Sequence, residues 1–461
     1  MTMKLPPGPK TPTWLLNIQF ASDPIGYMNA VTKRYGENFT IMFGSTPVVF
    51  ISNPEGLKEI FTNTKEITAP GELNQGLSLL GGTNGLLLLD GLRHKHRRKL
   101  LMPPLHGERM RSYGQRICQL TEEIISQQAI GKPFLAFPTM QVIALQVILE
   151  VVFGLNEGER YKQLRQLIPS LLSFPFSPIM SLIFSFPTLQ RDFGKRSPWG
   201  YFLYLREQFD KLLYSEINDR REQADSSRAD ILSDLVLALD ENGNPLTNED
   251  VRDLLPSFLF AGRNTEASAI AWGLYWIHKN LAVRDRLLEE LDSLGNFPDP
   301  ARIVALPYLN AVCNEVLRIN PSQVITLPRR VESPVTLMGY DLSPGTILRG
   351  CIYQTHQRED LYPQPKEFKP ERFLERQFSS YEFLPFGGGV RRCPAEALGL
   401  FEMKLVLATI LSRYQLALAD RRPEKPQPLG INFPPGKGLK MVIEGKRQRQ
   451  ERSPQFVAGS V

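Results

Sequence analysis

Two kinds of apolar spacing separate predicted strands from predicted helices in this chain. Near the start, residues 39–43 and 48–51 are short apolar runs typical of strands, and residues 54–61 have helical spacing. From residue 115 to residue 165, apolar positions recur at helical intervals and predict core helices. The pattern therefore predicts strands early in the chain and a longer helical region after them.

The longest helical pattern runs from Thr247 to about His278. Thr247 is followed three residues later by Asp250, which is typical of a capped helix start. Pro256 is expected to bend the first half of this helix, because proline removes a backbone hydrogen bond. No other helix candidate in the chain is as long, so this helix is expected to cross the domain.

The rest of the pattern predicts shorter elements. They are a helix over 306–318, strands over 335–338 and 346–348, a helix over 397–411, and strands and turns over 412–445. The polar tail 446–461 is expected to be disordered.

The segment from Gln166 to Gln190 contains no charged residue and is rich in Leu, Ile and Phe. Its composition could pass for a membrane span. Four prolines interrupt it: Pro169, Pro175, Pro178 and Pro187. Proline argues against a straight helix, so the residues taken alone indicate a buried connector.

Composition and charge limit the function classes. The chain has 461 residues, 42% of them hydrophobic, so it can bury a large core as one domain or two lobes. Its formal charge of +6 is modest and gives no case for a nucleic-acid partner. The four cysteines are widely separated, which fits neither a disulfide framework nor a paired metal site and suits a reducing compartment.

The N-terminal residues predict no targeting or membrane segment. Neither a signal-peptide apolar run nor a membrane span precedes the stiff segment from Leu5 to Pro9. A soluble cytoplasmic protein of bacterial type is therefore expected. The chain also has no internal repeat, no phosphate-binding glycine loop and no flavin or nicotinamide motif. Any electron donor is expected to be a separate protein.

The strongest chemical signal is the stretch 382–396, in which three glycines and two arginines precede Cys393. Because Pro394 favours the first helical position, Cys393 is predicted to be a helix N-cap. The helix dipole is expected to lower the thiol pKa there and to favour thiolate. A thiolate approached by backbone N–H groups suits one axial bond to haem iron. For a lone cysteine, packing in a buried loop is the alternative.

The order Phe386-x-x-Gly389-x-Arg391-x-Cys393 resembles the haem-binding loop of the cytochrome P450 superfamily. This pattern is long and specific. The family usually has glycine two residues after the cysteine, where this chain has Ala395, and the extra methyl group lies near the expected haem edge. The resemblance implies that Phe386, Gly389 and Arg391 contact haem b and that Cys393 binds its iron.

The resemblance covers about residues 35–445, with four motifs in the family order. It implies the cytochrome P450 fold, which is mainly α with small β regions. Residues 1–445 are expected to form a single domain, with a β-rich lobe over about 35–70 and a helical body over about 71–445. The haem is expected between the long central helix and the Cys393 loop.

The sequence Ala261-Gly262-x-x-Thr265 matches the oxygen-binding kink of the family. Small residues let the helix open beside the iron, and Thr265 can hold a carbonyl or a water. The family commonly has an acid before this threonine, where the chain has Asn264, which cannot relay a proton as a carboxyl can. Water held by Thr265 and Asn264 is one route for protons. The adjacent Glu266 is the other, although it points about 100° around the helix.

Basic residues are candidates for the haem propionates. His94 and Arg98 are four residues apart on one helix face, at a spacing where the family has an aromatic residue and an arginine. A histidine can still donate a hydrogen bond, and a guanidinium grips a carboxylate in a fork. Arg329 lies where the family places another such arginine, with Arg330 as its rival. The remaining basic residues of 93–99 are expected to be solvated and to face an acidic electron donor.

Other positions are assigned by the same resemblance. Phe260, Ala261, Val324 and Ile325 are expected to line the substrate pocket. The glycine-rich segment 77–90 is either a mobile surface loop or, as in the family, a cover over the substrate. Segment 166–190 is expected to roof the channel, with a peripheral membrane contact as a further expectation.

One predicted ion-pair group is structural. Glu315 and Arg318 are three residues apart, a spacing that alone indicates an ordinary surface ion pair. In the family these residues form a buried network completed by an arginine in the position of Arg372. His356 is expected to be a structural hydrogen-bonding residue, because Cys393 fits iron better.

The resemblance implies monooxygenation of a hydrophobic small molecule such as a fatty acid or terpenoid. Electrons are expected from a ferredoxin or flavodoxin and its reductase, and the protein is expected to be a monomer. Two other classes stay open: a haem-thiolate isomerase or dehydratase acting on peroxides, and a non-catalytic haem sensor. Retention of Thr265 argues against the isomerase.

Overall fold

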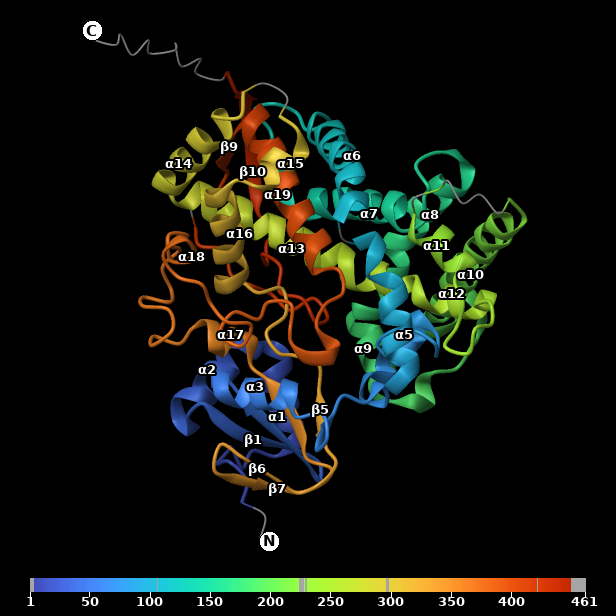
Figure 1. The fold of residues 1–461 in the computed structure, drawn as a ribbon, viewed down its shortest axis with the longest axis vertical. Coiled ribbons are helices and arrows are strands. Elements are labelled where there is room, and N and C mark those ends of the chain that lie inside the picture. The colour runs from blue at the N-terminus through green and yellow to red at the C-terminus, as the bar shows by residue number, and fades with distance from the viewer. Residues whose placement is uncertain are drawn as a thin grey trace.

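The protein has a large helical body with a smaller strand-rich part near its N-terminus (Figure 1). It is described by a computed structural model that covers residues 4–105, 107–223, 228, 230–295, 298–420 and 422–448. Within these residues the α-helices are α1 (Thr13–Ser22), α2 (Pro24–Tyr35), α3 (Pro54–Thr62), α4 (Ser78–Gly81), α5 (Gly91–Leu101), α6 (Gly107–Ile125), α7 (Ala136–Val151), α8 (Gly158–Ser173), α9 (Pro178–Ser185), α10 (Pro198–Gln223), α11 (Ile231–Leu237), α12 (Asn248–Leu254), α13 (Pro256–Lys279), α14 (Leu281–Asp292), α15 (Pro300–Val304), α16 (Pro307–Ile319), α17 (Ile352–His356), α18 (Arg372–Glu375) and α19 (Glu396–Arg413).

Short 3-10 helices connect several of these elements. They are η1 (Gly71–Leu77), η2 (Pro103–Leu105), η3 (Phe174–Phe176), η4 (Pro187–Leu189), η5 (Gly194–Arg196) and η6 (Gly389–Arg391).

The strands form three small sheets. They are β1 (Asn38–Phe43), β2 (Thr46–Ile51), β3 (Ile67–Thr68), β4 (Pro133–Leu135), β5 (Arg329–Val331), β6 (Val335–Leu337), β7 (Tyr340–Leu342), β8 (Ile347–Gly350), β9 (Tyr414–Leu418) and β10 (Lys440–Lys446). The strand orders are β1-β2-β8-β5-β3, β4-β10-β9 and β6-β7. Sheet formation near the start and at 335–348 therefore confirms the strand predictions made there.

The first sheet joins segments that are far apart in sequence. β1 and β2 form an antiparallel hairpin in which Phe39 pairs with Phe50, and their rings stack 5.2 Å apart. β8 then joins β2 in parallel, with Val49 opposite Leu348. The buried residues of this sheet and of α1, α2 and α3 form two apolar clusters separate from the core of the helical body.

The predicted long helix is two helices. Thr247 caps α12 as expected, with a reciprocal bond between its side chain and Asp250. α12 ends at Leu254, and Pro256 then occupies the first turn of α13, where its missing N–H costs nothing. The prediction that no helix is as long was wrong, because α10 has 26 residues and α13 has 24.

α13 crosses the middle of the helical body (Figure 1). It packs against α7 on one side and against α16 and α19 on another. Most of its residues from Ala267 to Ile277 are buried, including Trp272. α13 is therefore the element around which the core of the body is built.

The charge-free segment folds into short helices. Pro169 lies inside α8, and η3, α9 and η4 follow as separate short helices, so the segment is not one straight helix, as its prolines predicted. Several apolar side chains of this region are exposed, among them Phe186 and Leu189. Within the described residues, none of the helices combines the length and apolar character needed to span a membrane.

The C-terminal part packs onto the helical body. α19 leads into β9, and β10 pairs with both β9 and β4. Lys446 closes β10, and Arg447 pairs with Asp292 at 2.6 Å. The expected disorder of 446–461 is therefore wrong for its first two residues, and residues 449–461 lie outside the described part of the chain.

Candidate active site

The Cys393 segment precedes α19 and does not cap it. α19 begins at Glu396 with Ala395 in the capping position, so the predicted N-cap role of Cys393 was wrong. The backbone N–H of Cys393 instead donates to the carbonyl of Phe386 at 2.9 Å. This bond closes the loop from Phe386 to Cys393, which contains η6, and Cys393 lies three residues before α19.

The expectation of a low thiol pKa was also wrong for the free protein. Burial raises the pKa of the Cys393 thiol to about 11, although a backbone hydrogen bond from Ala395 and the charge of Arg98 act in the opposite direction. Desolvation is the largest of these effects, and Cys393 lies outside the first turn of α19, where the helix dipole would favour the thiolate. Only a bound cation at the sulfur would then favour the thiolate strongly.

The glycines before Cys393 serve close packing against α3. A Cβ on Gly388 would lie 2.5 Å from the Phe61 ring, and one on Gly389 would lie 2.9 Å from the Phe61 carbonyl oxygen. Gly389 also has a φ of +63°, which disfavours other residues. These glycines fix the loop against the strand-rich part of the molecule.

His356 supports the same loop from the other side. Its Nε2 accepts a hydrogen bond from the backbone N–H of Leu384 at 3.0 Å, and its ring stacks on Phe383. Burial and the nearby charge of Arg318 lower the pKa of His356 to about 3, so the imidazole is neutral. This contact agrees with the predicted structural role of His356.

A line of small residues on α13 borders open space. Ala261 is exposed, and Gly262, Thr265 and Glu266 are half-buried, although most residues around them on α13 are buried. A Cβ on Gly399, six residues after Cys393, would lie 3.2 Å from Oε2 of Glu266. The open face of α13 therefore lies beside the beginning of α19.

Thr265 is held by two residues that sequence reasoning missed. Its hydroxyl donates to Oδ1 of Asn432 at 2.8 Å, and its carbonyl accepts from the hydroxyl of Ser322 at 3.1 Å. Both partners are buried. Neither lies in a motif, so no local signal in the sequence could have pointed to them.

The structure does not bring Asn264 to the Thr265 hydroxyl. The Asn264 amide oxygen accepts from Nε2 of Gln141 at 2.8 Å and from the Arg263 guanidinium at 3.1 Å. Asn264 is buried toward α7 because consecutive residues point about 100° apart on a helix. Its expected role in holding water with Thr265 therefore has no support in the geometry.

Glu266 meets a second carboxyl instead. Burial and the nearby Glu402 raise the pKa of Glu266, and burial raises that of Glu402 on α19. One oxygen of each carboxyl is buried without a hydrogen-bond partner among the described residues. The raised pKa values favour a state in which at least one of the two carboxyl groups is protonated.

Four basic residues lie near one another between α5 and β5. Burial lowers the pKa of His94 to about 4, and the charges of Arg391, Arg98 and Arg329 lower it further, so this imidazole is neutral. The backbone carbonyl of Arg98 accepts a hydrogen bond from Met102, and among the described residues the Arg98 guanidinium itself has no hydrogen bond or ion pair. Arg391 donates to Asp90 at 2.8 Å and to the carbonyls of three residues, Ala69, Leu86 and Leu89.

Arg329 is a buried cation without a carboxylate partner among the described residues. It is 3% exposed, and its guanidinium donates only to the carbonyls of Leu327, Pro328 and Gly388. Its rival Arg330 is half-exposed and pairs with Glu72 and Glu332. Of these two arginines, Arg329 is therefore the one whose charge has no carboxylate partner among the described residues.

The remaining basic run is not a uniformly solvated face. Arg97 is 2% exposed and lies 3.4 Å from Asp250. Arg93 pairs with Glu241 at 3.2 Å. The prediction that these residues are solvated and face an electron donor was wrong for Arg97, which is buried, and it stays a prediction for Arg93, whose side chain is 47% exposed.

The predicted pocket residues fall in two places. Phe260 lines a small cavity of about 20 Å³ together with Gly81, Gly85, Leu87, Leu88, Pro256 and Ser257. The backbone N–H of Asn84 donates to Asp253 at 2.8 Å, which ties segment 77–90 to the end of α12. Val324 is buried, whereas Ile325 is half-buried and packs on the cluster of α1 and β2.

The matching family model is "Cytochrome P450", and it covers residues 6–440. The chain belongs to the cytochrome P450 family. A protein of Mycobacterium tuberculosis that is provisionally named cytochrome P450 135B1 is 32% identical over 448 residues, covering 97% of this chain and 93% of the relative. Another from the same organism, provisionally named cytochrome P450 138, is 30% identical over 450 residues, covering 96% of each.

Solved structures confirm the predicted fold. Retinoic-acid-bound cyanobacterial CYP120A1 matches with a TM-score of 0.81 and 24% identity, over 96% of this chain and 99% of that one. The haem domain of cytochrome P450DA matches with a TM-score of 0.85 and 18% identity, over 97% of this chain and 99% of that one. This cytochrome P450 is thus mainly α with small β regions, and haem b is its cofactor.

The residues of this P450 fit such a group. Haem carries two carboxylates, and Arg329 and Arg98 are cations without an acidic hydrogen-bond partner among the described residues. Cys393 is half-buried beside the open face of α13, and no group of three possible metal-ligating side chains competes with it in the described part of the chain. A haem-thiolate site requires a thiol that can bind the iron, and arginines without other acidic partners can bind the haem carboxylates.

The buried ion-pair network of the P450 is linked to the Cys393 segment through His356, whose carbonyl accepts from Arg318 and whose ring accepts from the N–H of Leu384. Arg318 donates to both oxygens of Glu315, at 2.7 and 2.8 Å, and Arg372 donates to the same carboxylate at 3.2 Å. Glu315 and Arg318 are fully buried. The structure therefore brings together the three residues that the sequence grouped.

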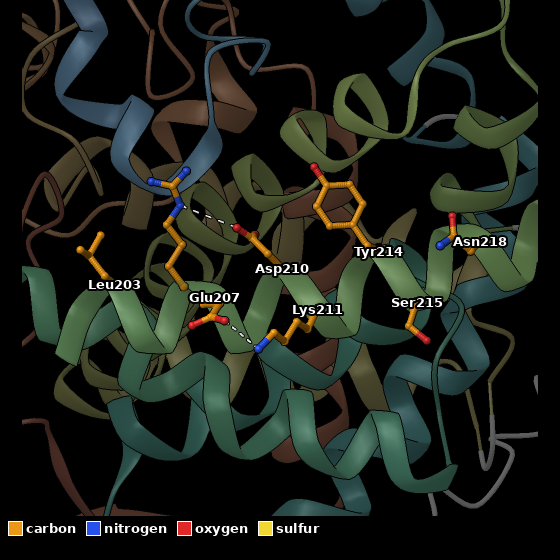
Figure 2. Close-up of a pocket in the computed structure, with 8 residues that line it drawn as sticks. Leu203, Glu207, Asp210, Lys211, Tyr214, Ser215 and Asn218 are labelled. Carbon is orange, nitrogen blue, oxygen red and sulfur yellow. Dashed lines mark ion pairs between the residues drawn. The ribbon is translucent and has the colours of Figure 1, made fainter. Parts of the chain in front are cut away.

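A separate groove of about 690 Å³ runs along α10 (Figure 2). Its side chains largely pair among themselves, as Glu207 does with Lys211 at 2.7 Å. None of its lining residues belongs to α13 or to the Cys393 segment. The groove is therefore not part of the candidate site.

Proposed function

We propose that this P450 inserts one oxygen atom from dioxygen into a hydrophobic, lipid-like molecule such as a fatty acid or terpenoid. A ferredoxin or flavodoxin with its reductase supplies the electrons, and the protein acts as a cytoplasmic monomer. The observation that carries the proposal is the open face of α13 at Ala261 and Thr265, beside the segment that carries Cys393.

The site residues divide the work of holding the cofactor. Cys393 provides the iron ligand, and Arg329, Arg98 and the neutral His94 provide donors for the propionates. Phe386, Gly389 and Arg391 shape the loop around the sulfur. Haem bound there supplies the binding and stepwise reduction of dioxygen.

The protein residues manage water and protons. Ala261 and Gly262 leave room on α13 because their side chains are small or absent. Thr265 donates its hydroxyl hydrogen to Asn432, so its oxygen is free to accept a hydrogen bond from a water in the site. Glu266, with Glu402 nearby, retains a proton and serves as a reserve behind that water. Asn264 plays no direct part.

Apolar surface supports the substrate class. Phe260 lines a cavity together with Leu87 and Leu88, and segment 166–190 contributes no charge. Phe186 near the end of that segment and Phe193 just after it are exposed, as are the neighbouring basic residues Arg191 and Lys195. This combination suits peripheral contact with an anionic membrane surface, from which an apolar substrate would enter.

Ligand-difference spectra of the holoprotein with palmitic acid, retinoic acid and a sesquiterpene test the substrate class. We expect at least one to shift the haem spectrum and to yield a product with one added oxygen when ferredoxin, its reductase and NADPH are present. Cys393→Ala, as control, is expected to lose the thiolate signature of the carbon-monoxide complex.

Two results would contradict this proposal. Rearrangement of a lipid hydroperoxide without reductant would assign the isomerase or dehydratase class. Haem binding without substrate-dependent oxygen consumption across the three ligands would assign a sensor.

A further inference from the structure

The hydroxyl of Thr265 depends on the last hairpin of the chain. Asn432 lies 167 residues away in sequence, yet its Oδ1 accepts from Thr265 Oγ1 at 2.8 Å. Asn432 is only 3% exposed, so water does not compete freely for this bond. The geometry is that of a fully formed hydrogen bond between two side chains.

The hairpin is rigidly placed. Leu429 and Asn432 exchange two backbone hydrogen bonds, of 2.8 and 3.1 Å, which close a tight turn at its tip. Gln427 donates to Pro434 at 3.0 Å, one step below the tip. The Asn432 side chain therefore projects from a turn whose backbone is already fixed.

The same face of α13 binds the hairpin a second time. Trp272 is seven residues after Thr265, so the two side chains lie on one side of the helix. The indole N–H of Trp272 donates to the carbonyl of Phe433 at 2.9 Å, next to Asn432. Two consecutive hairpin residues, Asn432 and Phe433, thus bind side chains two helical turns apart on α13. The second bond fixes the hairpin against the helix, so the Asn432 contact depends on this packing.

The chain neighbours of Thr265 leave it no other side-chain partner among the described residues. Asn264 is bound to Gln141 and Arg263, and Glu266 lies beside Gly399 and Glu402. Ser322 binds the Thr265 carbonyl and not its hydroxyl. Among the described side chains, Asn432 is therefore the one that accepts the hydroxyl hydrogen and sets its direction.

We infer that Asn432 is a positioning residue that orients the Thr265 hydroxyl and so controls how much dioxygen ends in product. With its hydrogen donated to Asn432, Thr265 presents lone pairs to a water that carries protons to the reaction. Productive turnover consumes dioxygen, substrate, two electrons and two protons to give hydroxylated substrate and water. Without an ordered water, dioxygen, two electrons and two protons leave as hydrogen peroxide.

This inference rests on the proposed monooxygenase function, so its test includes a measurement that needs no substrate. We would compare Asn432→Ala, Asn432→Asp, Thr265→Ala and the double variant Thr265→Ala/Asn432→Ala as holoproteins. Asn320→Ala is the matched control, because Asn320 accepts from the Trp276 side chain of α13 at 2.7 Å in the same way. Peroxide released per NADPH and thermal unfolding midpoints are the measurements.

We expect Asn432→Ala to raise the peroxide fraction several-fold, as Thr265→Ala does, with no further rise in the double variant. Asn432→Asp keeps an acceptor oxygen and is expected to restore much of the coupling. The unfolding midpoint of the double variant is expected to fall by less than the sum of the single shifts, because one bond is lost in each case. Asn320→Ala is expected to lower the midpoint while leaving the peroxide fraction unchanged.

An unchanged peroxide fraction in Asn432→Ala, or additive effects in the double variant, would overturn the inference. A midpoint loss with unaltered peroxide release would assign Asn432 a purely structural role. If no organic product forms with any ligand but peroxide release from the reduced protein still rises in both single variants, the substrate proposal fails and this inference stands.

Discussion

At the scale of single residues, buried charge is the clearest sign of a missing partner. A guanidinium as buried as that of Arg329 is costly unless an anion accompanies it. Its three carbonyl acceptors engage only part of its five N–H groups and carry no charge, and burial lowers its pKa to about 10. A haem propionate would supply the anion, which explains why the chain tolerates this residue there.

Replacing Arg329 by alanine is expected to weaken haem binding. Charge-assisted hydrogen bonds contribute roughly 1.5–3 kcal/mol each, so haem is expected to leave about tenfold faster or more. The rate of haem transfer to excess apomyoglobin measures this. Arg330→Ala is the control, because Arg330 is half-exposed and already has acidic partners. Equal haem-loss rates in the two variants would refute the assignment of Arg329.

At the scale of elements, the ion-pair network joins α16 to α18. Glu315 neutralises both Arg318 and Arg372, and Arg318 also donates to the carbonyls of His356, Pro365 and Glu367. One carboxylate therefore holds together a helix and the long loop before the Cys393 segment. This placement makes the network a support for the loop.

Removing Glu315 is expected to destabilise the protein strongly. Glu315→Ala leaves two buried guanidinium groups unpaired, and breaking such a pair costs roughly 3–5 kcal/mol. Urea unfolding measures the change, and Glu315→Gln, which keeps the shape, serves if the alanine variant does not fold. Glu207→Ala is the control, because its pair with Lys211 is exposed and such pairs contribute about 0–1 kcal/mol. A similar midpoint in both variants would contradict the buried role.

At the scale of the whole molecule, buried titratable groups make stability depend on pH. Burial is the main cause that lowers the pKa of His94 and His278 to about 4 and of His356 to about 3. Each binds a proton more readily when unfolded, so stability falls as pH drops from about 6.5 toward 4. Glu266 and Glu402 act oppositely, because their raised pKa values cost stability as pH rises above the usual carboxyl range.

His278 isolates one of these contributions. It lies near the end of α13, where its Nδ1 bonds the Leu274 carbonyl at 2.7 Å, away from the candidate active site. His278→Gln removes the proton linkage, so the stability of the native protein relative to this variant is expected to fall by about 2 kcal/mol between pH 7 and pH 5. Urea unfolding at the two pH values measures it. Parallel pH curves for the two proteins would show that His278 does not titrate as described.

The sequence by itself determined the features that depend on neighbours within a few residues. The Cys393 loop, the Ala261–Thr265 motif and the Glu315–Arg318 pair are contiguous patterns, and periodicity predicted most helices and strands. The capping box at Thr247 followed from residues three apart. Such signals are local because helix caps, turns and side-chain periods are set by backbone geometry over one or two turns.

Only the tertiary structure decided which side chains contact one another and which are shielded from solvent. The bond from Thr265 to Asn432 joins residues 167 positions apart, and the burial of Arg97 against Asp250 depends on how α5 packs on α12. The raised thiol pKa of Cys393 reverses a local expectation in the same way. Packing between residues far apart in the sequence determines which groups are desolvated and which hydrogen-bond and ion-pair partners they have. Neither property produces a periodic pattern in the sequence.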